Sequence, residues 1–95
     1  MKTATFIKDV SEKFDFEGEA ILFKLEPPVP YRVNGIEHMT EYVVSHDNLE
    51  EEEPYTHVLP SDKDGNVFWP LLWESWNPIG CYLALHYMGY DVDES

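Results

Sequence analysis

The sequence predicts an α+β fold in which a small antiparallel sheet of three to five strands packs one face against a single C-terminal helix. Three observations support this prediction. Two β-rich runs lie within residues 42–59, a cleanly alternating segment lies at 19–25, and an apolar run from Pro78 to Met88 carries helix signals at both ends. The remaining residues supply turns and shorter strands around these three elements.

The stretch Tyr42–Leu59 is typical of an antiparallel strand pair. Its two outer runs, Tyr42–Ser45 and Tyr55–Leu59, are rich in β-branched and aromatic residues, which favour strands. Between them lies a polar, acidic interval that ends in Pro54. We therefore expect a hairpin with a charged loop at its tip.

The segment Glu19–Leu25 alternates apolar residues between two faces, as a strand does. Proline has no N–H for a strand ladder, so the Pro27–Pro30 run is expected to end this strand. Asn34-Gly35 favours a two-residue type I′ turn. Near the start of the chain, Thr3–Ile7 suggests a short strand followed by a helical turn.

The last helix is predicted from its capping residues. Asn77 suits the N-cap, Pro78 the first helical position, and Gly89 a left-handed C-cap. The helix lacks a polar face, which indicates cover on more than one side. Either the Trp69–Trp76 segment, with a helical turn expected at Leu71–Trp76, or another chain would supply that cover. Residues 91–95 are expected to form a frayed acidic tail.

Length and composition indicate one domain, residues 1–95, whose 43% hydrophobic content can support a core. Cys81 is the single cysteine, so an intrachain disulfide is excluded and a reducing compartment is favoured. Neither a signal peptide nor an apolar stretch of about 20 residues is visible. We therefore expect a soluble protein of the cytoplasm, which is the host cytoplasm if the chain is phage-encoded.

Net charge is the strongest compositional signal. Nineteen Asp and Glu residues against six Lys and Arg residues give −13, whereas solubility needs a magnitude of only about 2–8. Direct binding to nucleic acid or to an anionic membrane is unfavourable, because phosphate contacts require Lys and Arg. The sequence instead favours a basic protein partner.

Residues able to bind a metal or attack a substrate are few: His46, His57, Cys81 and His86. None has the short spacing typical of zinc ligands, although His46 and His57 lie on paired strands and could approach each other. The interval Asp62–Asn66 lacks the oxygen ligands of a calcium loop and is interpreted as a turn. We expect no catalytic residues, no metal and no cofactor, and a protein that is not an enzyme.

Partner-binding residues are expected in two chemical groups. Carboxylates near the start of the chain and in the hairpin loop would form an acidic surface resembling the phosphate array of DNA. A tryptophan-rich segment could supply interface anchors, although core packing is its simpler interpretation. The candidates are Asp9, Glu12, Asp15, Glu17, Asp47, Glu50, Glu51, Glu52, Glu53, Trp69, Trp73 and Trp76.

Four spaced pieces of the chain resemble small acidic proteins that bacteriophages and mobile elements encode and that are mostly uncharacterised. The pieces are Glu19–Pro28, Tyr42–Ser45, Pro60–Val67 and Gly89–Val92, about half of the chain. The resemblance implies a phage or mobile-element setting. Small acidic phage proteins include inhibitors of host nucleases and polymerases, some of them DNA mimics, and no functional residue follows from the likeness.

Three functional hypotheses follow. The first is a non-catalytic acidic binding protein, a phage-type inhibitor or DNA mimic acting on a basic, nucleic-acid-handling host protein. The alternative is a hydrophobic interaction or homodimerisation module that uses the tryptophan-rich segment and the last helix. The third is a metal- or thiol-dependent enzyme built on the histidines and Cys81.

Overall fold

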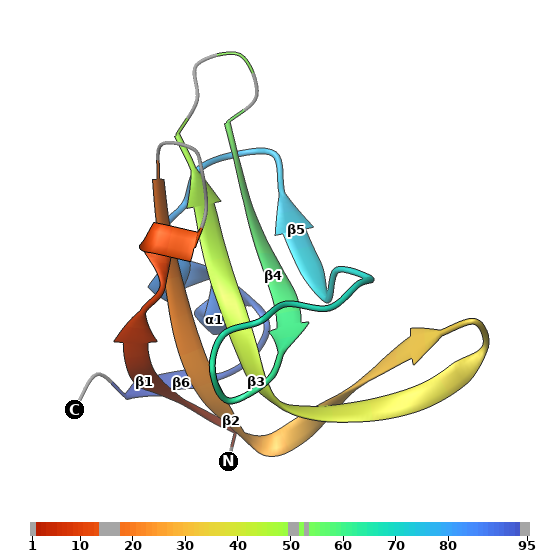
Figure 1. Cartoon of the computed structure of the whole chain (residues 1–95). Helices are drawn as coiled ribbons and strands as arrows, with labels where there is room; N and C mark the ends of the chain where they lie inside the picture. The colour runs from red at the N-terminus through yellow and green to blue at the C-terminus, as the bar shows by residue number, and fades with distance from the viewer. Residues whose placement is uncertain (1, 14–17, 50–51, 53, 94–95) are drawn as a thin grey trace.

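Strands dominate the computed structural model, which describes residues 2–13, 18–49, 52 and 54–93 (Figure 1). The strands are β1 (Thr3–Asp9), β2 (Gly18–Val33), β3 (Ile36–Asn48), β4 (Tyr55–Ser61), β5 (Trp73–Ser75) and β6 (Asp91–Asp93). They form one sheet in the order β5-β4-β3-β2-β1-β6. Neighbours are antiparallel except β1 and β6, which are parallel.

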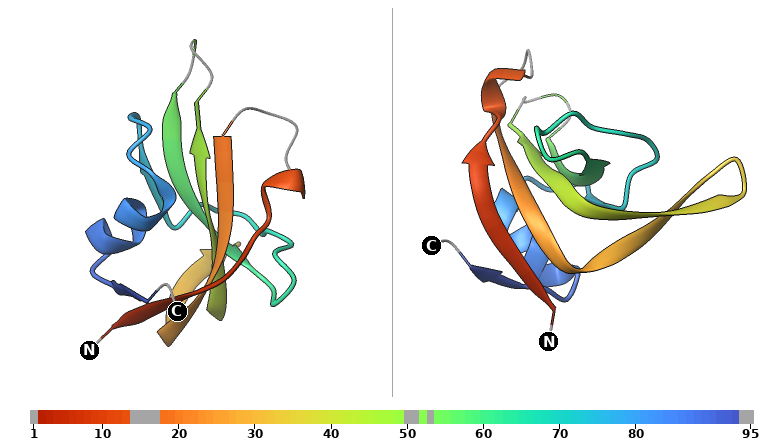
Figure 2. Two further views of the ribbon diagram at one scale, coloured as in Figure 1. Left: turned by 90° about the vertical axis from the view of Figure 1, so that its left-hand side faces the viewer. Right: turned by 60° about the horizontal axis from the view of Figure 1, so that its bottom comes forward.

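The prediction of a small antiparallel sheet with three to five strands is wrong. The six strands form a mixed sheet that curls into a half-barrel (Figure 2). The extra strands are the three-residue edge strands β5 and β6, which occupy positions expected to form a helical turn and a frayed tail. Such short strands depend on pairing with a longer neighbour, so their own sequence carries no periodic signal.

Strand β2 does not end at the prolines, contrary to the prediction. It pairs with β3 from Gly18 opposite Asn48, shifts register after Lys24, and pairs again from Val29 opposite Thr40. The prolines fall in or just after the shift, where the ladder tolerates missing N–H groups. Beyond it, the two strands project from the body as the β2–β3 arm, residues 29–40 (Figure 1).

The predicted turns and hairpins are confirmed in part of the chain. The β2–β3 arm ends in a two-residue turn with φ of 52° at Asn34 and 80° at Gly35, as a type I′ turn requires. The expected hairpin of Tyr42–Leu59 is present as the antiparallel pair β3 and β4. The predicted N-terminal strand and helical turn correspond to β1 and the 3₁₀ helix η1 (Ser11–Lys13).

Helix α1 spans Cys81–Tyr87 and is shorter than the predicted Pro78–Met88. Its N-terminus is delayed because the Thr56 hydroxyl accepts from Ile79 N at 2.9 Å and donates to Asn77 O at 3.0 Å, which ties this segment to β4. The predicted C-cap is confirmed at Gly89, with φ of 94°. No helix among the described residues is long and apolar enough to cross a membrane.

The sheet is buried on both faces. One face packs against α1 through a cluster that includes Phe23, Val43 and Leu85, while the opposite face has a smaller cluster that includes Leu22 and Val44. Val10, just before η1, belongs to the second cluster, and Val67 of the 62–70 loop packs against it. Lys13 Nζ of η1 donates to Asp64 O at 2.9 Å, which joins η1 to this loop. The predicted alternation along 19–25 is confirmed: odd and even residues enter different clusters.

Candidate functional site: an acidic end and a histidine pair

The start of β2 and the end of β3 meet at one end of the sheet, which we call the acidic end. Gly18 lies opposite Asn48, and Glu19 lies opposite Asp47. Helix η1 is fixed beside them because Val10 N donates to Ala20 O at 2.8 Å. The described carboxylates at or beside this end belong to Glu12, Glu19, Asp47 and Glu52.

Asp47 and Glu19 are directly opposed across β2 and β3, on the face that α1 covers. Asp47 is 8% exposed, and its Oδ1 lies 3.2 Å from the Thr56 hydroxyl, which shares its single proton between this carboxylate and Asn77 O. Burial raises the pKa of Asp47, and the Thr56 hydrogen bond opposes that effect. The two acidic residues are thus cross-strand neighbours of different exposure, with Asp47 buried and Glu19 exposed.

The carboxylates have little internal compensation. An ion pair joins exposed Arg32 and Glu37 at 3.9 Å, far from the acidic end on the β2–β3 arm. Lys13, the cation of η1, directs its ammonium to Asp64 O and Asn66 Oδ1. Since surface ion pairs are weak, neither of these cations offsets much of the charge at the acidic end.

A histidine pair lies next to the acidic end on the opposite face of the sheet. His46 and His57 are cross-strand partners, and His46 Nδ1 lies 2.9 Å from His57 Nε2, so one ring donates to the other. Burial lowers the pKa of each histidine to about 4, and His57 further lowers that of His46. The Tyr55 ring lies 4.7 Å from that of His57. The predicted approach of the two histidines is confirmed.

Neutral imidazoles are suited to proton transfer or metal binding. Among the residues that the structure describes, no group of three or more His, Cys, Asp or Glu side chains is arranged to hold a metal. The cross-strand neighbour of His57 on β5 is Glu74, which is exposed. His86 lies apart from the pair, on the exposed side of α1.

Cys81 is on the other face of the sheet from the histidine pair. Its thiol is buried and lies 3.3 Å from Glu19 O, and its carbonyl accepts from the Ser45 hydroxyl at 2.9 Å. Burial raises the pKa of Cys81, and the carboxylates of Glu19 and Asp47 add to the rise. A raised pKa disfavours the thiolate that a nucleophile requires.

The three predicted tryptophans divide between core and surface. Trp73 is half-buried against the core and stacks on Tyr87 of α1, with ring centroids 6.2 Å apart. Trp69 and Trp76 are 66% and 79% exposed. The tryptophan segment therefore supplies cover for α1 through one side chain and exposed aromatic surface through the other two.

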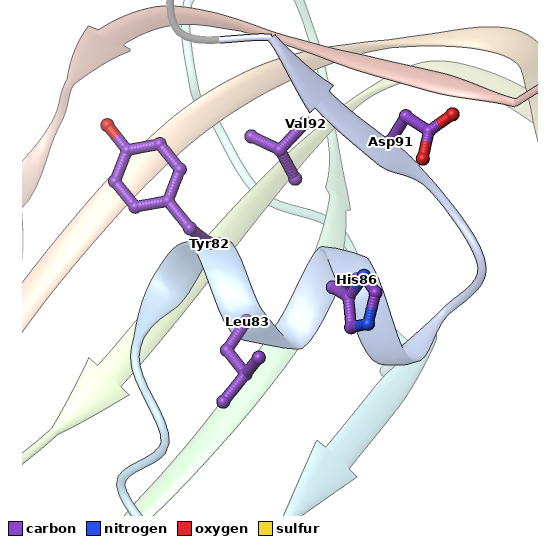
Figure 3. A pocket seen from close by; sticks show the side chains of 5 residues that line it. All are labelled: Tyr82, Leu83, His86, Asp91 and Val92. Atoms are coloured by element: carbon purple, nitrogen blue, oxygen red, sulfur yellow. The ribbon is translucent and has the colours of Figure 1, made fainter.

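An open pocket of about 410 Å³ lies between α1 and β6 (Figure 3). Its wall consists of Tyr82, Leu83, His86, Asp91 and Val92, with Tyr82 also packed edge-on against Phe23. Two polar side chains, His86 and Asp91, are among them. The residues predicted to bind a partner are not part of this pocket.

The remaining predicted contacts fall in three places. Asp9 is exposed at the end of β1 and accepts from Ser11 N at 2.7 Å. Hydrogen bonding by the Ser11 side chain, and then by its backbone, lowers the pKa of Asp9. Glu12 and Glu52 are exposed near the acidic end, and Asp47 lies within β3 rather than in a loop. Five further predictions lie outside the described residues: Asp15, Glu17, Glu50, Glu51 and Glu53.

No protein-family model, curated protein or solved structure matches this chain. The site therefore has to be interpreted from its own geometry. The feature that sequence reasoning missed is the direct opposition of Glu19 and Asp47, since it depends on the register of β2 against β3. A weak signal was present: both residues are acidic neighbours of strongly β-forming runs.

Proposed function

We propose that this chain is a non-catalytic binding protein whose acidic end holds a basic protein partner. The opposition of Glu19 and Asp47 across β2 and β3 is the observation that carries the proposal. The register brings two acidic residues together at one end of the sheet, where negative charge attracts a cationic side chain of the partner. The exposed carboxylates of Glu12 and Glu52 extend the same negative surface.

The partner class follows from the charge of the whole chain. At −13, the protein repels phosphates and attracts cationic grooves, and such grooves are what nucleic-acid-handling proteins present to their substrates. Carboxylates gathered at one end would occupy a groove of this kind in place of nucleic acid. On this proposal the protein acts as an inhibitor of phage type, by DNA mimicry.

The test uses a synthetic arginine-rich peptide as the basic probe and measures its affinity for the full chain by fluorescence anisotropy. Glu12→Gln combined with Glu19→Gln should weaken binding by about fivefold, because exposed ion pairs contribute roughly 0.2–1 kcal/mol each. Raising the salt from low to physiological strength should also weaken binding, since charges beyond about 8 Å become screened.

The matched control removes the same number of charges elsewhere. Glu26 and Asp91 are exposed carboxylates away from the acidic end, so Glu26→Gln with Asp91→Asn has the same net charge as the test variant. The control should bind nearly as tightly as the unmodified chain. Equal losses in the two variants, or an affinity that salt does not change, would contradict the proposal.

A second candidate function is self-association through exposed aromatic surface. Trp76 and Tyr87 are 79% and 62% exposed, and large aromatic side chains are enriched in interface hot spots. Sedimentation velocity separates this candidate from the first. A dimer that persists at high salt and dissociates on Trp76→Ser would support it, and a monomer under all conditions would exclude it.

A further inference from the structure

The β2–β3 arm has one closed edge and one bare edge. In an antiparallel pair, every second residue exchanges two N–H···O=C hydrogen bonds with the residue opposite it. The residues between these direct their N–H and C=O groups away from the partner strand. The two-residue turn makes Val33 and Ile36 an exchanging pair, so the outward-pointing positions include Pro30 and Arg32 on β2 and Glu37 and Met39 on β3.

The β2 edge of the arm is protected by proline. Pro30 has no N–H to donate, and Pro27 and Pro28 lie just before the arm on the same strand. Proline on an edge strand is a common means of preventing further strand addition. The outer edges of the sheet, β5 and β6, are protected in another way: each has only three residues, and β6 contains two aspartates.

The β3 edge of the arm has no such protection. Pairing with β4 begins at Tyr42, so among the described residues no strand lies beyond 36–39 on that side. Glu37 and Met39 each direct an N–H and a C=O into solvent. Ile36 and Met39 are 63% and 58% exposed, which adds large apolar side chains to an unpaired backbone edge.

The arm is held in shape before any partner arrives. Tyr31 stacks on His38 across the two strands, with ring centroids 5.4 Å apart, and the Asn34-Gly35 turn joins the strands at the tip. A preorganised edge avoids much of the ordering cost that weakens peptide binding. Addition of an extended peptide to such an edge is an established mode of recognition.

We infer that the edge of β3 at 36–39 accepts an extended basic segment of a partner protein as an added strand. Glu37, Met39 and Glu41 alternate along β3, so a strand opposite them would carry basic, apolar and basic residues at alternate positions. This inference rests on the proposed function for the basic class of the partner and adds a second contact for that partner, on the arm and away from the acidic end.

Charge also decides against a second copy of this chain at the same edge. Antiparallel self-pairing centred on Met39 would place Glu37 opposite Glu41 twice, and like charges opposite each other are destabilising. Each copy also carries −13. A basic segment places no like charges opposite Glu37 and Glu41, and it is attracted by the net negative charge of the chain.

The experiment uses a labelled peptide that contains Lys-Thr-Val-Thr-Lys, with the full chain as receptor. Met39→Pro removes the outward N–H at the centre of the bare edge, and because Met39 faces Pro30 in a non-exchanging pair, no β2–β3 bond is lost. Binding should weaken about fivefold or more, the scale of one lost backbone hydrogen bond. The same peptide with N-methylated central residues keeps its charge and should bind at least as weakly.

Arg32→Pro is the matched control, because it removes an outward N–H from the β2 edge of the same arm. The substitution also removes a positive charge. Because that loss reduces repulsion of a basic peptide, binding should not weaken. If Met39→Pro prevents folding, amide hydrogen exchange on the unmodified chain decides: the peptide should protect Glu37 and Met39.

The outcomes separate the two proposals. If the peptide affinity depends on salt but is unchanged by Met39→Pro and by N-methylation, strand addition is overturned and the acidic-end proposal remains. Salt-insensitive binding that Met39→Pro abolishes would overturn the basic-partner proposal instead. Protection of Glu37 and Met39 without peptide, together with a dimer in sedimentation, would assign the edge to a second copy and overturn the inference.

Discussion

The two imidazoles of His46 and His57 make the fold sensitive to acid. Their folded pKa values of about 4 lie below the ordinary 6.5, so the unfolded chain binds more protons between these limits. Stability should therefore fall as the pH drops from 6.5 through about 4. With a discount for partial solvent access, we expect a loss on the order of 1–3 kcal/mol in urea unfolding.

A variant comparison isolates the histidines from the carboxylates, which also titrate toward the lower end of this range. His57→Gln removes one titrating ring and can still hydrogen-bond with His46, so its stability should depend less on pH than that of the unmodified chain. His86→Gln changes an exposed histidine on α1 and should leave the pH dependence unchanged. If the free energy of unfolding varies with pH equally in His57→Gln and in the unmodified chain, the buried pair does not titrate as stated.

At the level of elements, the sequence predicted those whose signal is local. The Asn34-Gly35 turn, the Gly89 cap and the β3–β4 hairpin each depend on residues that are close in sequence, and each is present. The continuation of β2 through the Pro27–Pro30 run was missed because β3 holds the strand on both sides of the register shift. Strand β6 was missed because its partner, β1, lies at the opposite end of the chain.

Gly18 is the position where an element depends most strongly on one small residue. Its φ is 135°, and a Cβ there would stand 1.8 Å from Asp47 O, inside any permissible contact distance. Gly18→Ala must therefore separate the first residues of β2 from the end of β3. We expect a loss of about 2–4 kcal/mol in thermal or urea unfolding, within the range for severe backbone strain.

Gly89→Ala provides the comparison for Gly18→Ala. Gly89 also has positive φ, at 94°, but an added Cβ meets no atom within 4 Å. Its cost should be only about 1 kcal/mol, the usual penalty for a left-handed alanine. Comparable losses in the two variants would mean that β2 and β3 separate at little cost, and that close contact at the acidic end is not required.

On the scale of the whole molecule, composition shows the surplus of negative charge but could not place it in the fold. The excess of carboxylates is visible in the sequence, whereas the meeting of Glu19 with Asp47 requires the register that the rest of β2 and β3 sets. Register follows from which apolar residues are buried on each face, and that depends on the covers supplied by α1 and the 62–70 loop. The acidic end is thus a consequence of the complete fold.

The same surplus of charge should be visible in the stability of the free protein. Two exposed charges about 8 Å apart repel by about 0.5 kcal/mol in water, and screening reduces such terms across the molecule. Sodium chloride should therefore raise the free energy of unfolding by roughly 1–2 kcal/mol between low and physiological ionic strength, as measured with urea. Glu12→Gln with Glu19→Gln should show a smaller gain, because two of the crowded charges are already removed. If the gain is unchanged in that variant, the repulsion is spread evenly over the surface. The acidic end then contributes no more repulsion than other regions, and a partner bound there would relieve no special part of it.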